Sequence, residues 1–238
     1  MKRLTRLSAV IIIAVLSFAA PGYGAGLTEV IATLEQGYNL LGDLQADFSQ
    51  RTIIASMKRE ERGNGELFIK KPAAGPALFR FNYTKPRQQI ISDGKTVWYY
   101  LPDNKQVMVN DVTALFEGGG GIALNYLTGM GQVSKDFTIT FSGAGRDQKG
   151  NYLLELVPKQ PSQVMTKLQL TIVSSAVDQF LESGAARTPF PILSSVVHDP
   201  FGNRTVIEFS HVKVNQGMGN DRFAFKIPKG VEVIKTSH

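Results

Sequence analysis

The chain has 238 residues, a formal net charge of +6 and no cysteine. The absence of cysteine excludes disulfides and thiol catalysis, and it removes the softest metal ligands. The chain is long enough to bury a substantial apolar core, so its stability must come from packing.

Residues 1–24 have the pattern of a signal peptide. Three basic residues precede an apolar run at 7–20, which is shorter than the roughly 20 residues of a membrane span. The small residues that follow suit cleavage after Gly24. We therefore expect residues 25–238 to form one exported domain that is free in the periplasm.

Loss of the signal peptide changes the charge. It removes three of the 26 basic residues and leaves 23 against 20 acidic ones, a net charge of about +3. A nucleic-acid-binding surface needs basic residues that cluster with aromatic ones along one face. The modest charge and the export signal argue against nucleic acid as a partner.

The exported part is predicted to begin with a helix over 27–41. Apolar residues recur there at steps of three and four, the spacing of one helical face. They are Leu27, Val30, Ile31, Leu34, Tyr38 and Leu41. Gly42 is placed to end this helix, because glycine accepts the left-handed geometry of a helix terminus.

After residue 42 the apolar period changes to two, which is typical of strands with one solvent-facing side. Eleven strands are expected at 44–49, 66–70, 79–84, 88–92, 95–101, 106–110, 137–142, 152–157, 167–173, 193–198 and 204–210. Turn residues join several of them, as at 93–94, 102–104 and 200–203. The pattern predicts a mainly β protein with an antiparallel meander and some helix.

Two stretches interrupt the meander. Within 111–130, four consecutive glycines at 118–121 precede an apolar stretch at 122–127, which suits short helices hinged on glycine. Within 176–191, a helical turn could precede Gly184, and two prolines then force an irregular return of the chain.

No residues have the spacing of a metal site. Two of the three histidines, His198 and His211, fall in or beside strands and lack the spacing of a metal-binding helix, and His238 is the last residue. His198 and Asp199 could form a catalytic pair, but the residues after them are explained more simply by a hairpin turn.

Two short motifs match enzyme signatures by their letters alone. Ser92 and Lys95 satisfy S-x-x-K, in which the serine begins a helix, but Asp93 and Gly94 predict a tight turn there. The glycines at 118–123 satisfy G-x-G-x-x-A, which requires a βαβ unit that this strand pattern lacks. We therefore expect no catalytic residue and no enzymatic activity.

The strand at 97–101 is bulky and apolar on both faces, as in a sheet that is covered on each side. Ordinary core packing would explain this pattern. A concave sheet covered by helices, with space left for a lipid chain, would explain it as well.

Segments along the exported chain are shared with one known family. Residues 91–100 read Ile-Ser-Asp-Gly-Lys-Thr-Val-Trp-Tyr-Tyr, which is similar to the signature hairpin of that family. Further similar segments are 47–50 for its first strand, 65–72 and 78–81 for the next two, 122–129 for its lid helix and 223–231 for its closing strand. Together they resemble the outer-membrane lipoprotein carrier family, LolA.

The resemblance implies an incomplete, strongly curved antiparallel β half-barrel of about 11 strands. An N-terminal helix and a helical lid would lie over an apolar cavity. Members accept lipoproteins that an ATP-driven transporter releases from the inner membrane, and they pass them to an outer-membrane receptor. The resemblance implies no cofactor and a monomeric carrier.

The same resemblance suggests site residues. The candidate walls of the acyl-chain cavity are Phe79, Phe81, Tyr83, Trp98 and Tyr100, with Leu124 and Leu127 from the lid. Lys71 stands where the best-known carriers have an arginine that bonds lid backbone, and lysine lacks the planar fork of arginine. If Lys71 latches the lid, we expect Lys71→Glu to impair loading or release of lipoprotein without unfolding the chain.

Two other functions remain open at this point. A periplasmic sensor could use the same half-barrel to read mislocalised lipids or lipoproteins and signal to a partner. A carrier of another amphiphilic lipid would have much the same sequence pattern.

Overall fold

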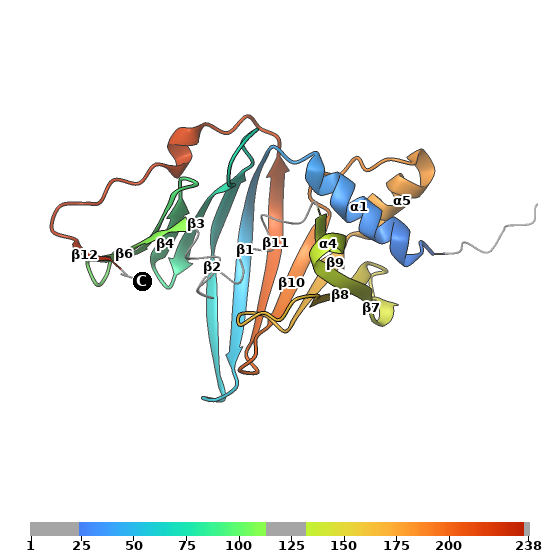
Figure 1. The fold of residues 1–238 in the computed structure, drawn as a ribbon, viewed down its shortest axis with the longest axis horizontal. Coiled ribbons are helices and arrows are strands. Elements are labelled where there is room, and N and C mark those ends of the chain that lie inside the picture. The colour runs from blue at the N-terminus through green and yellow to red at the C-terminus, as the bar shows by residue number, and fades with distance from the viewer. Residues whose placement is uncertain (1–23, 113–131, 236–238) are drawn as a thin grey trace, which may run out of the picture.

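The computed structural model describes residues 24–112 and 132–235 (Figure 1). Its helices are α1 (Leu27–Asn39), α4 (Val133–Asp136), α5 (Ser174–Ser183) and the 3-10 helix η2 (Asn220–Phe223). Its strands are β1 (Asp43–Ile54), β2 (Arg59–Lys70), β3 (Leu78–Lys85), β4 (Gln88–Ser92), β5 (Thr96–Leu101), β6 (Gln106–Asp111), β7 (Phe137–Arg146), β8 (Tyr152–Pro158), β9 (Lys167–Ile172), β10 (Ile192–His198), β11 (Arg204–Val214) and β12 (Glu232–Lys235). The predicted signal-peptide run and the predicted lid helix lie outside the described residues. Within these two ranges, no helix is long and apolar enough to cross a membrane.

All twelve strands belong to one sheet, in the order β12-β6-β5-β4-β3-β2-β1-β11-β10-β9-β8-β7. Two antiparallel meanders, β1 to β6 and β7 to β11, are joined by antiparallel pairing of β1 with β11. The sheet curls but stays open at both edges (Figure 1). The predicted mainly β fold, an incomplete and strongly curved antiparallel half-barrel, is confirmed, and each of the eleven predicted strands is present.

The predicted closing strand at 223–231 is wrong. The chain forms η2 and then an extended segment without strand pairing, and the last strand is β12, which pairs in parallel with β6. The side chains of Phe223 and Phe225 pack on the sheet, and the backbone around them does not pair as a strand. Pro228 also lacks the N–H group that a ladder requires.

The end of α1 differs from the prediction as well. The helix stops at Asn39, with Leu40 as a right-handed C-cap, so Gly42 is not its terminator. Gly42 instead donates its backbone N–H to the side-chain oxygen of Asn215 at 2.7 Å. A contact with the end of β11, and not a local glycine signal, determines where the chain turns into β1.

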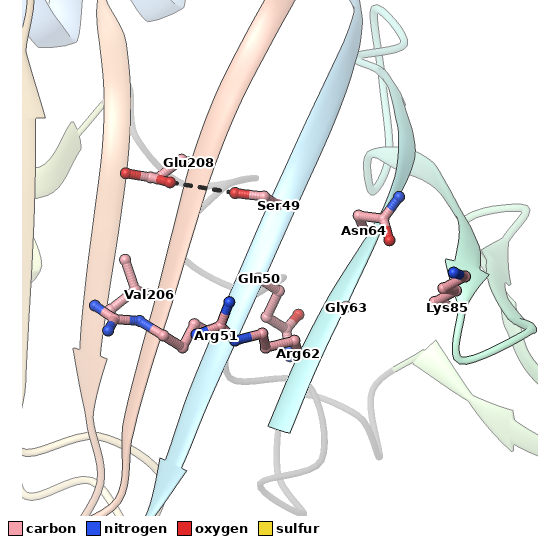
Figure 2. A pocket seen from close by; sticks show the side chains of 9 residues that line it. All are labelled: Ser49, Gln50, Arg51, Arg62, Gly63, Asn64, Lys85, Val206 and Glu208. Carbon is pink, nitrogen blue, oxygen red and sulfur yellow. Dashed lines mark hydrogen bonds between the residues drawn. The ribbon is translucent and has the colours of Figure 1, made fainter. Parts of the chain in front are cut away.

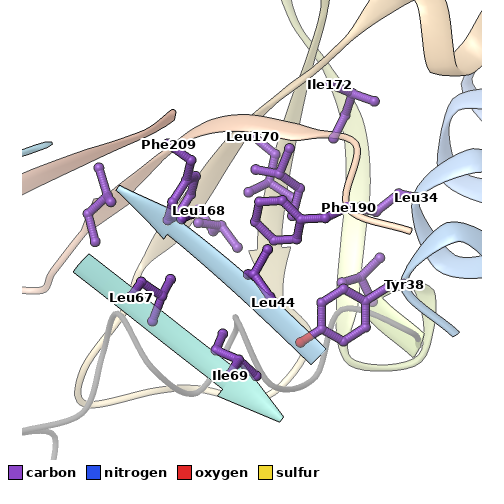
Figure 3. Close-up of a cluster of buried hydrophobic side chains, with 14 of the residues drawn as sticks. Leu34, Tyr38, Leu44, Leu67, Ile69, Leu168, Leu170, Ile172, Phe190 and Phe209 are labelled. Atoms are coloured by element: carbon purple, nitrogen blue, oxygen red, sulfur yellow. The ribbon is translucent and has the colours of Figure 1, made fainter. Parts of the chain in front are cut away.

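The core lies on the face of the sheet that packs against α1, which we call the inner face. Leu34 and Tyr38 of α1 join Leu168 and Leu170 of β9 in one buried apolar cluster (Figure 3). Gly37 lets the helix come close to the chain after α5, because a Cβ atom there would lie 2.4 Å from the carbonyl oxygen of Thr188. In Figure 1, α1, α4 and α5 all lie on the β7 to β10 side of the molecule.

The opposite, outer face carries the segment 216–231, which we call the C-terminal strap. Its start is held by the buried carboxylate of Asp43, which accepts backbone N–H groups from Gln216 at 2.8 Å, Gly217 at 2.8 Å and Met218 at 3.0 Å. Farther along, the strap is anchored by packing: Phe223 is buried with Phe68 and Leu78.

Candidate functional site

The strand register defines which side chains share the inner face of the β2 to β6 half. Phe81 pairs with Leu67 on one side and with Ile90 on the other, and Ile90 pairs with Tyr99. Side chains directly opposite each other in a sheet point to the same face. The inner-face positions around Phe81 include Leu67, Ile69, Phe79, Tyr83, Ile90, Ser92, Val97, Tyr99 and Met108, and the polar residues Gln88, Gln106 and Asn110 share the same face. None of these positions carries a charge.

Three aromatic rings form the centre of this half. Phe48 of β1 meets Phe81 edge-on with ring centroids 5.4 Å apart, and it meets Tyr83 edge-on at 4.8 Å. The rings of Phe81 and Tyr83 are stacked at 6.3 Å. Edge-to-face and offset-stacked rings at these distances attract each other beyond simple burial. We call Phe48, Phe81 and Tyr83 the aromatic cluster.

Two glycines of β2 make room beside the aromatic cluster. A Cβ atom on Gly63 would lie 3.1 Å from the ring of Tyr83, and one on Gly65 would lie 1.9 Å from the carbonyl oxygen of Asn82. Gly65 also pairs directly with Phe48. Glycine in a strand marks a close approach of this kind, and here it lets β3 and the aromatic rings lie against β2.

The two tyrosine hydroxyls beside the aromatic cluster are hydrogen bonded. The hydroxyl of Tyr83 donates to the side-chain oxygen of Gln50 at 2.8 Å, and that of Tyr99 donates to Gln88 at 2.7 Å. Burial raises the pKa of both tyrosines above the ordinary value, and for Tyr83 the neighbouring Tyr99 adds to the effect. Both hydroxyls therefore stay neutral near neutral pH, and this face remains apolar.

The predicted cavity wall divides between two faces. Phe79, Phe81 and Tyr83 point to the inner face with the core cluster. Trp98 and Tyr100 point outward, where the ring of Phe225 in the C-terminal strap lies 5.9 and 5.4 Å from them. The five residues therefore do not share one face of the sheet, because Trp98 and Tyr100 lie on the side opposite to the other three.

The two lid candidates, Leu124 and Leu127, lie outside the described residues. Lys71, the predicted latch, is described, and its ammonium donates to the carbonyl oxygen of Tyr38 at 2.8 Å. It also lies 4.6 Å from the centre of the Tyr38 ring, and burial lowers its pKa below the ordinary value. The contact described for Lys71 is thus with the end of α1.

Sequence reasoning missed three members of the inner face. Phe48 and Tyr99 lie in strands that the alternation predicts, but the alternation does not say which face their side chains occupy. Ile90 lies in β4, which is between β1 and β5 in the sheet. Alternation shows that Tyr99 faces away from Trp98. Only the pairing of Ile90 with Tyr99 and of Ile91 with Trp98 shows which of the two faces is inner.

The weak enzyme motif has a structural explanation. The buried hydroxyl of Ser92 accepts the backbone N–H of Gly94 at 3.1 Å, and Asp93 accepts that of Lys95 at 2.9 Å. Gly94 has a φ of +90°, which suits a tight turn between strands. These residues build the β4–β5 hairpin turn as predicted.

The proposed catalytic pair His198 and Asp199 is explained by the β10–β11 hairpin turn. The carboxylate of Asp199 accepts backbone N–H groups from Phe201 at 2.9 Å and Asn203 at 2.8 Å, and so it is committed to its own turn. His198 instead has its Nε2 atom 3.4 Å from the side-chain oxygen of Gln169. Among the described residues, no group of three or more His, Cys, Asp or Glu side chains could hold a metal ion.

Comparison with protein families gives one match over more than half of the chain. Residues 40–181 match the model described as "Outer membrane lipoprotein carrier protein LolA". This range contains the aromatic cluster, both β2 glycines and Lys71.

Curated relatives extend the match beyond that range. An outer-membrane lipoprotein carrier protein of Xanthomonas oryzae pv. oryzae is 31% identical over 228 residues, covering 95% of this chain and 96% of the relative. One from Azotobacter vinelandii is 30% identical over 193 residues, which are 81% of each chain.

A solved structure supports the fold alone. An uncharacterized conserved protein from Thermus thermophilus aligns with a TM-score of 0.50 and 17% identity, covering 88% of this chain and 98% of that one.

Proposed function

Since the chain belongs to the outer-membrane lipoprotein carrier protein family, LolA, we propose that it binds the acyl chains of lipoproteins and carries them through the periplasm. The observation that carries the proposal is the uncharged stretch of the inner face between Leu67 of β2 and Met108 of β6, centred on the aromatic cluster. This half lies away from α1, α4 and α5 in Figure 1. Phe79, Phe81 and Tyr83 remain candidate cavity residues, joined by Phe48, Ile90 and Tyr99.

The physical need for such a face is direct. Moving an acyl chain from a bilayer into water costs about 0.8 kcal/mol per CH₂ group. An apolar protein surface removes most of that cost during transit. Tyr83 and Tyr99 bring neutral, hydrogen-bonded hydroxyls to this buried apolar face, so an acyl chain placed there would meet no buried charge that needs a partner.

Delivery requires that binding stay reversible. A carrier must hold the acyl chains more weakly than the site that receives them, since a ligand moves spontaneously only toward lower free energy. We propose that an ATP-driven inner-membrane transporter loads the chain and that an outer-membrane receptor unloads it. Residues 1–24 would then be the export signal, removed after Gly24.

Photo-crosslinking from two neighbouring residues of β5 tests the assignment of faces. A benzoylphenylalanine at Tyr99 would face inward and one at Tyr100 outward, although the positions adjoin. After incubation with spheroplasts that carry labelled lipoprotein, the Tyr99 variant should crosslink to cargo and the Tyr100 variant should not. The pair is matched in residue type, strand and distance from the chain ends.

Release without crosslinking provides the second readout. The unmodified mature chain should move labelled lipoprotein from spheroplasts into the supernatant as a one-to-one complex. Release with crosslinks from Tyr100 alone would keep the carrier role and overturn the inner-face site. No release by a folded chain, together with phospholipid seen in native mass spectra, would replace lipoprotein by another amphiphile as the cargo.

A further inference from the structure

Two hairpin ends lie side by side at one end of the sheet. The β1–β2 turn, residues 55–58, and the β10–β11 turn, residues 199–203, both project beyond the strands at the lower end of Figure 1. The backbone N–H of Ala55 donates to the side-chain oxygen of Asn203 at 2.9 Å, which fastens one turn to the other. We call these two turns the hairpin tips.

Each tip holds one large apolar side chain out in solvent. Phe201 is 78% exposed and Met57 is 66% exposed, the two highest values among large hydrophobic residues in the described part of the chain. Phe201 is held there by a stiff turn, because Asp199 accepts its backbone N–H and Gly202 takes a φ of +80°. Neither side chain contributes to the buried core clusters.

Cations surround the two tips. Arg51, Lys58, Arg59, Arg62 and Arg204 lie in or beside them, against the carboxylates Glu60, Glu61 and Asp199. Glu60 pairs with Arg62 at 2.7 Å and with Arg51 at 3.8 Å, Glu61 pairs with Arg59, and Asp199 is committed to its own turn. Five cations against three carboxylates therefore leave a local surplus of positive charge.

A cleft of about 550 Å³ lies farther along the β1 and β2 strands, behind the tips (Figure 2). Three of its lining side chains are cations, Arg51, Arg62 and Lys85, and one is a carboxylate, Glu208, which accepts the hydroxyl of Ser49 at 3.2 Å. Arg51 pairs with Arg62 three residue pairs back from the end of the β1–β2 ladder, about 10 Å along the strands. That depth matches the separation between the apolar edge and the phosphates of a membrane interface.

We propose that the hairpin tips dock on an anionic phospholipid surface, with Met57 and Phe201 entering its apolar edge and the basic cleft facing lipid phosphates. A protein partner would be met by a contiguous apolar centre with a polar rim. The tips offer two separate protruding side chains ringed by cations, which is the arrangement that an anionic membrane interface binds. The docking does not depend on the acyl-chain site, and it would set the sheet end-on to the membrane.

Co-sedimentation of the cargo-free mature chain with vesicles tests the docking. The chain should bind vesicles that contain phosphatidylglycerol and leave vesicles of pure phosphatidylcholine largely free, and the binding should weaken with added salt. Phe201→Ser should reduce binding about tenfold, since it removes one largely exposed aromatic ring from the apolar contact. Arg62→Gln with Lys85→Gln should reduce binding to phosphatidylglycerol vesicles and flatten the salt dependence.

Leu181→Ser is the matched control, because Leu181 is 48% exposed on α5, away from the tips. It should bind vesicles like the unchanged chain, and circular dichroism should show all variants folded. Equal binding by Phe201→Ser and Leu181→Ser would overturn the proposal. A complete absence of vesicle binding would also overturn it. So would self-association that depends on the tips, or tip-dependent binding to a membrane protein in detergent without any binding to lipid. Release of lipoprotein from spheroplasts is measured separately, so loss of docking is distinguishable from loss of the carrier role.

Discussion

The side-chain nitrogen of Lys71 lies 2.8 Å from the carbonyl oxygen of Tyr38, and the backbone N–H of Lys71 lies 2.8 Å from the carbonyl oxygen of Gly42. Tyr38 is in the last turn of α1, where the helix dipole is negative, and its carbonyl oxygen also accepts the backbone N–H of Leu41 at 3.2 Å. Lys71 follows directly after β2. One residue therefore ties the end of the N-terminal helix to the strand that borders the aromatic cluster.

Replacing Lys71 by methionine should lower the free energy of unfolding by about 1 to 2 kcal/mol. The change keeps the length of the side chain but removes the hydrogen bond that the half-buried ammonium donates to the helix end. Lys71→Arg should lose less, because it keeps the charge. Urea unfolding followed by circular dichroism measures both.

Lys149→Met is the control for this comparison, since Lys149 lies in the exposed β7–β8 turn. Hydrogen exchange should quicken in the last turn of α1 in Lys71→Met and stay unchanged in Lys149→Met. Equal stability of Lys71→Met and the unchanged chain would show that the contact with Tyr38 contributes nothing measurable.

Asp43→Asn should loosen the C-terminal strap. The carboxylate accepts three backbone N–H groups at the start of the strap, and an amide offers one acceptor oxygen in place of two. We expect a loss of about 1 to 3 kcal/mol in the free energy of unfolding. Limited proteolysis should cut within 216–231 faster than in Asp178→Asn, which changes an exposed aspartate on α5; identical cutting would contradict the role of Asp43.

Local sequence patterns predicted the strands because each needs only a period of two along its own length. The same alternation separates Trp98 and Tyr100 from Tyr99 within β5. It does not say that Trp98 and Tyr100 meet Phe225, since that contact depends on a strap far along the chain. The division of the predicted wall between two faces is therefore a consequence of register and of long-range packing.

The ends of α1 and the position of β12 were harder to predict for a related reason. α1 stops before Gly42 because Asn215, at the end of β11, takes the N–H of Gly42 and donates to the carbonyl oxygen of Leu40. β12 pairs in parallel with β6 through four exposed residues, which leave no apolar alternation to detect. Both features are set by tertiary partners and have no local signature.

Gly65→Ala should be among the most destabilising small changes in the chain. Its Cβ atom would lie 1.9 Å from the carbonyl oxygen of Asn82, so β2 and β3 would have to separate beside the aromatic cluster. We expect a loss of about 3 kcal/mol in the free energy of unfolding.

Gly26→Ala makes the same chemical change at an extended position before α1, where only the mobile end of the Glu29 side chain is close. It should cost less, about 1 kcal/mol or below, because alanine is a poorer N-cap residue than glycine. Thermal unfolding of both variants, with tyrosine fluorescence to report on Tyr83, measures the difference. Similar stability of the two would mean that β2 and β3 can separate at this point without cost.

The stability of the chain should fall on mild acidification in a way that depends on His198. Burial lowers the pKa of His198 below its ordinary value, and Lys167 and Arg204 add to this, while Glu155 opposes it. The unfolded chain then takes up a proton near pH 6.5, before the folded chain does. The free energy of unfolding therefore decreases as the pH falls through about 6.5, and this contribution levels off below the folded-state pKa.

His198→Gln removes that contribution and keeps a side chain able to bond Gln169. The difference in free energy of unfolding between variant and unchanged chain should be constant above pH 7 and should shift in favour of the variant as the pH falls below about 6.5. The other titratable groups are the same in both chains, so their contributions to the free energy of unfolding cancel in the difference. Urea unfolding at a series of pH values measures it, and parallel curves for the two chains would show that folding does not perturb the titration of His198.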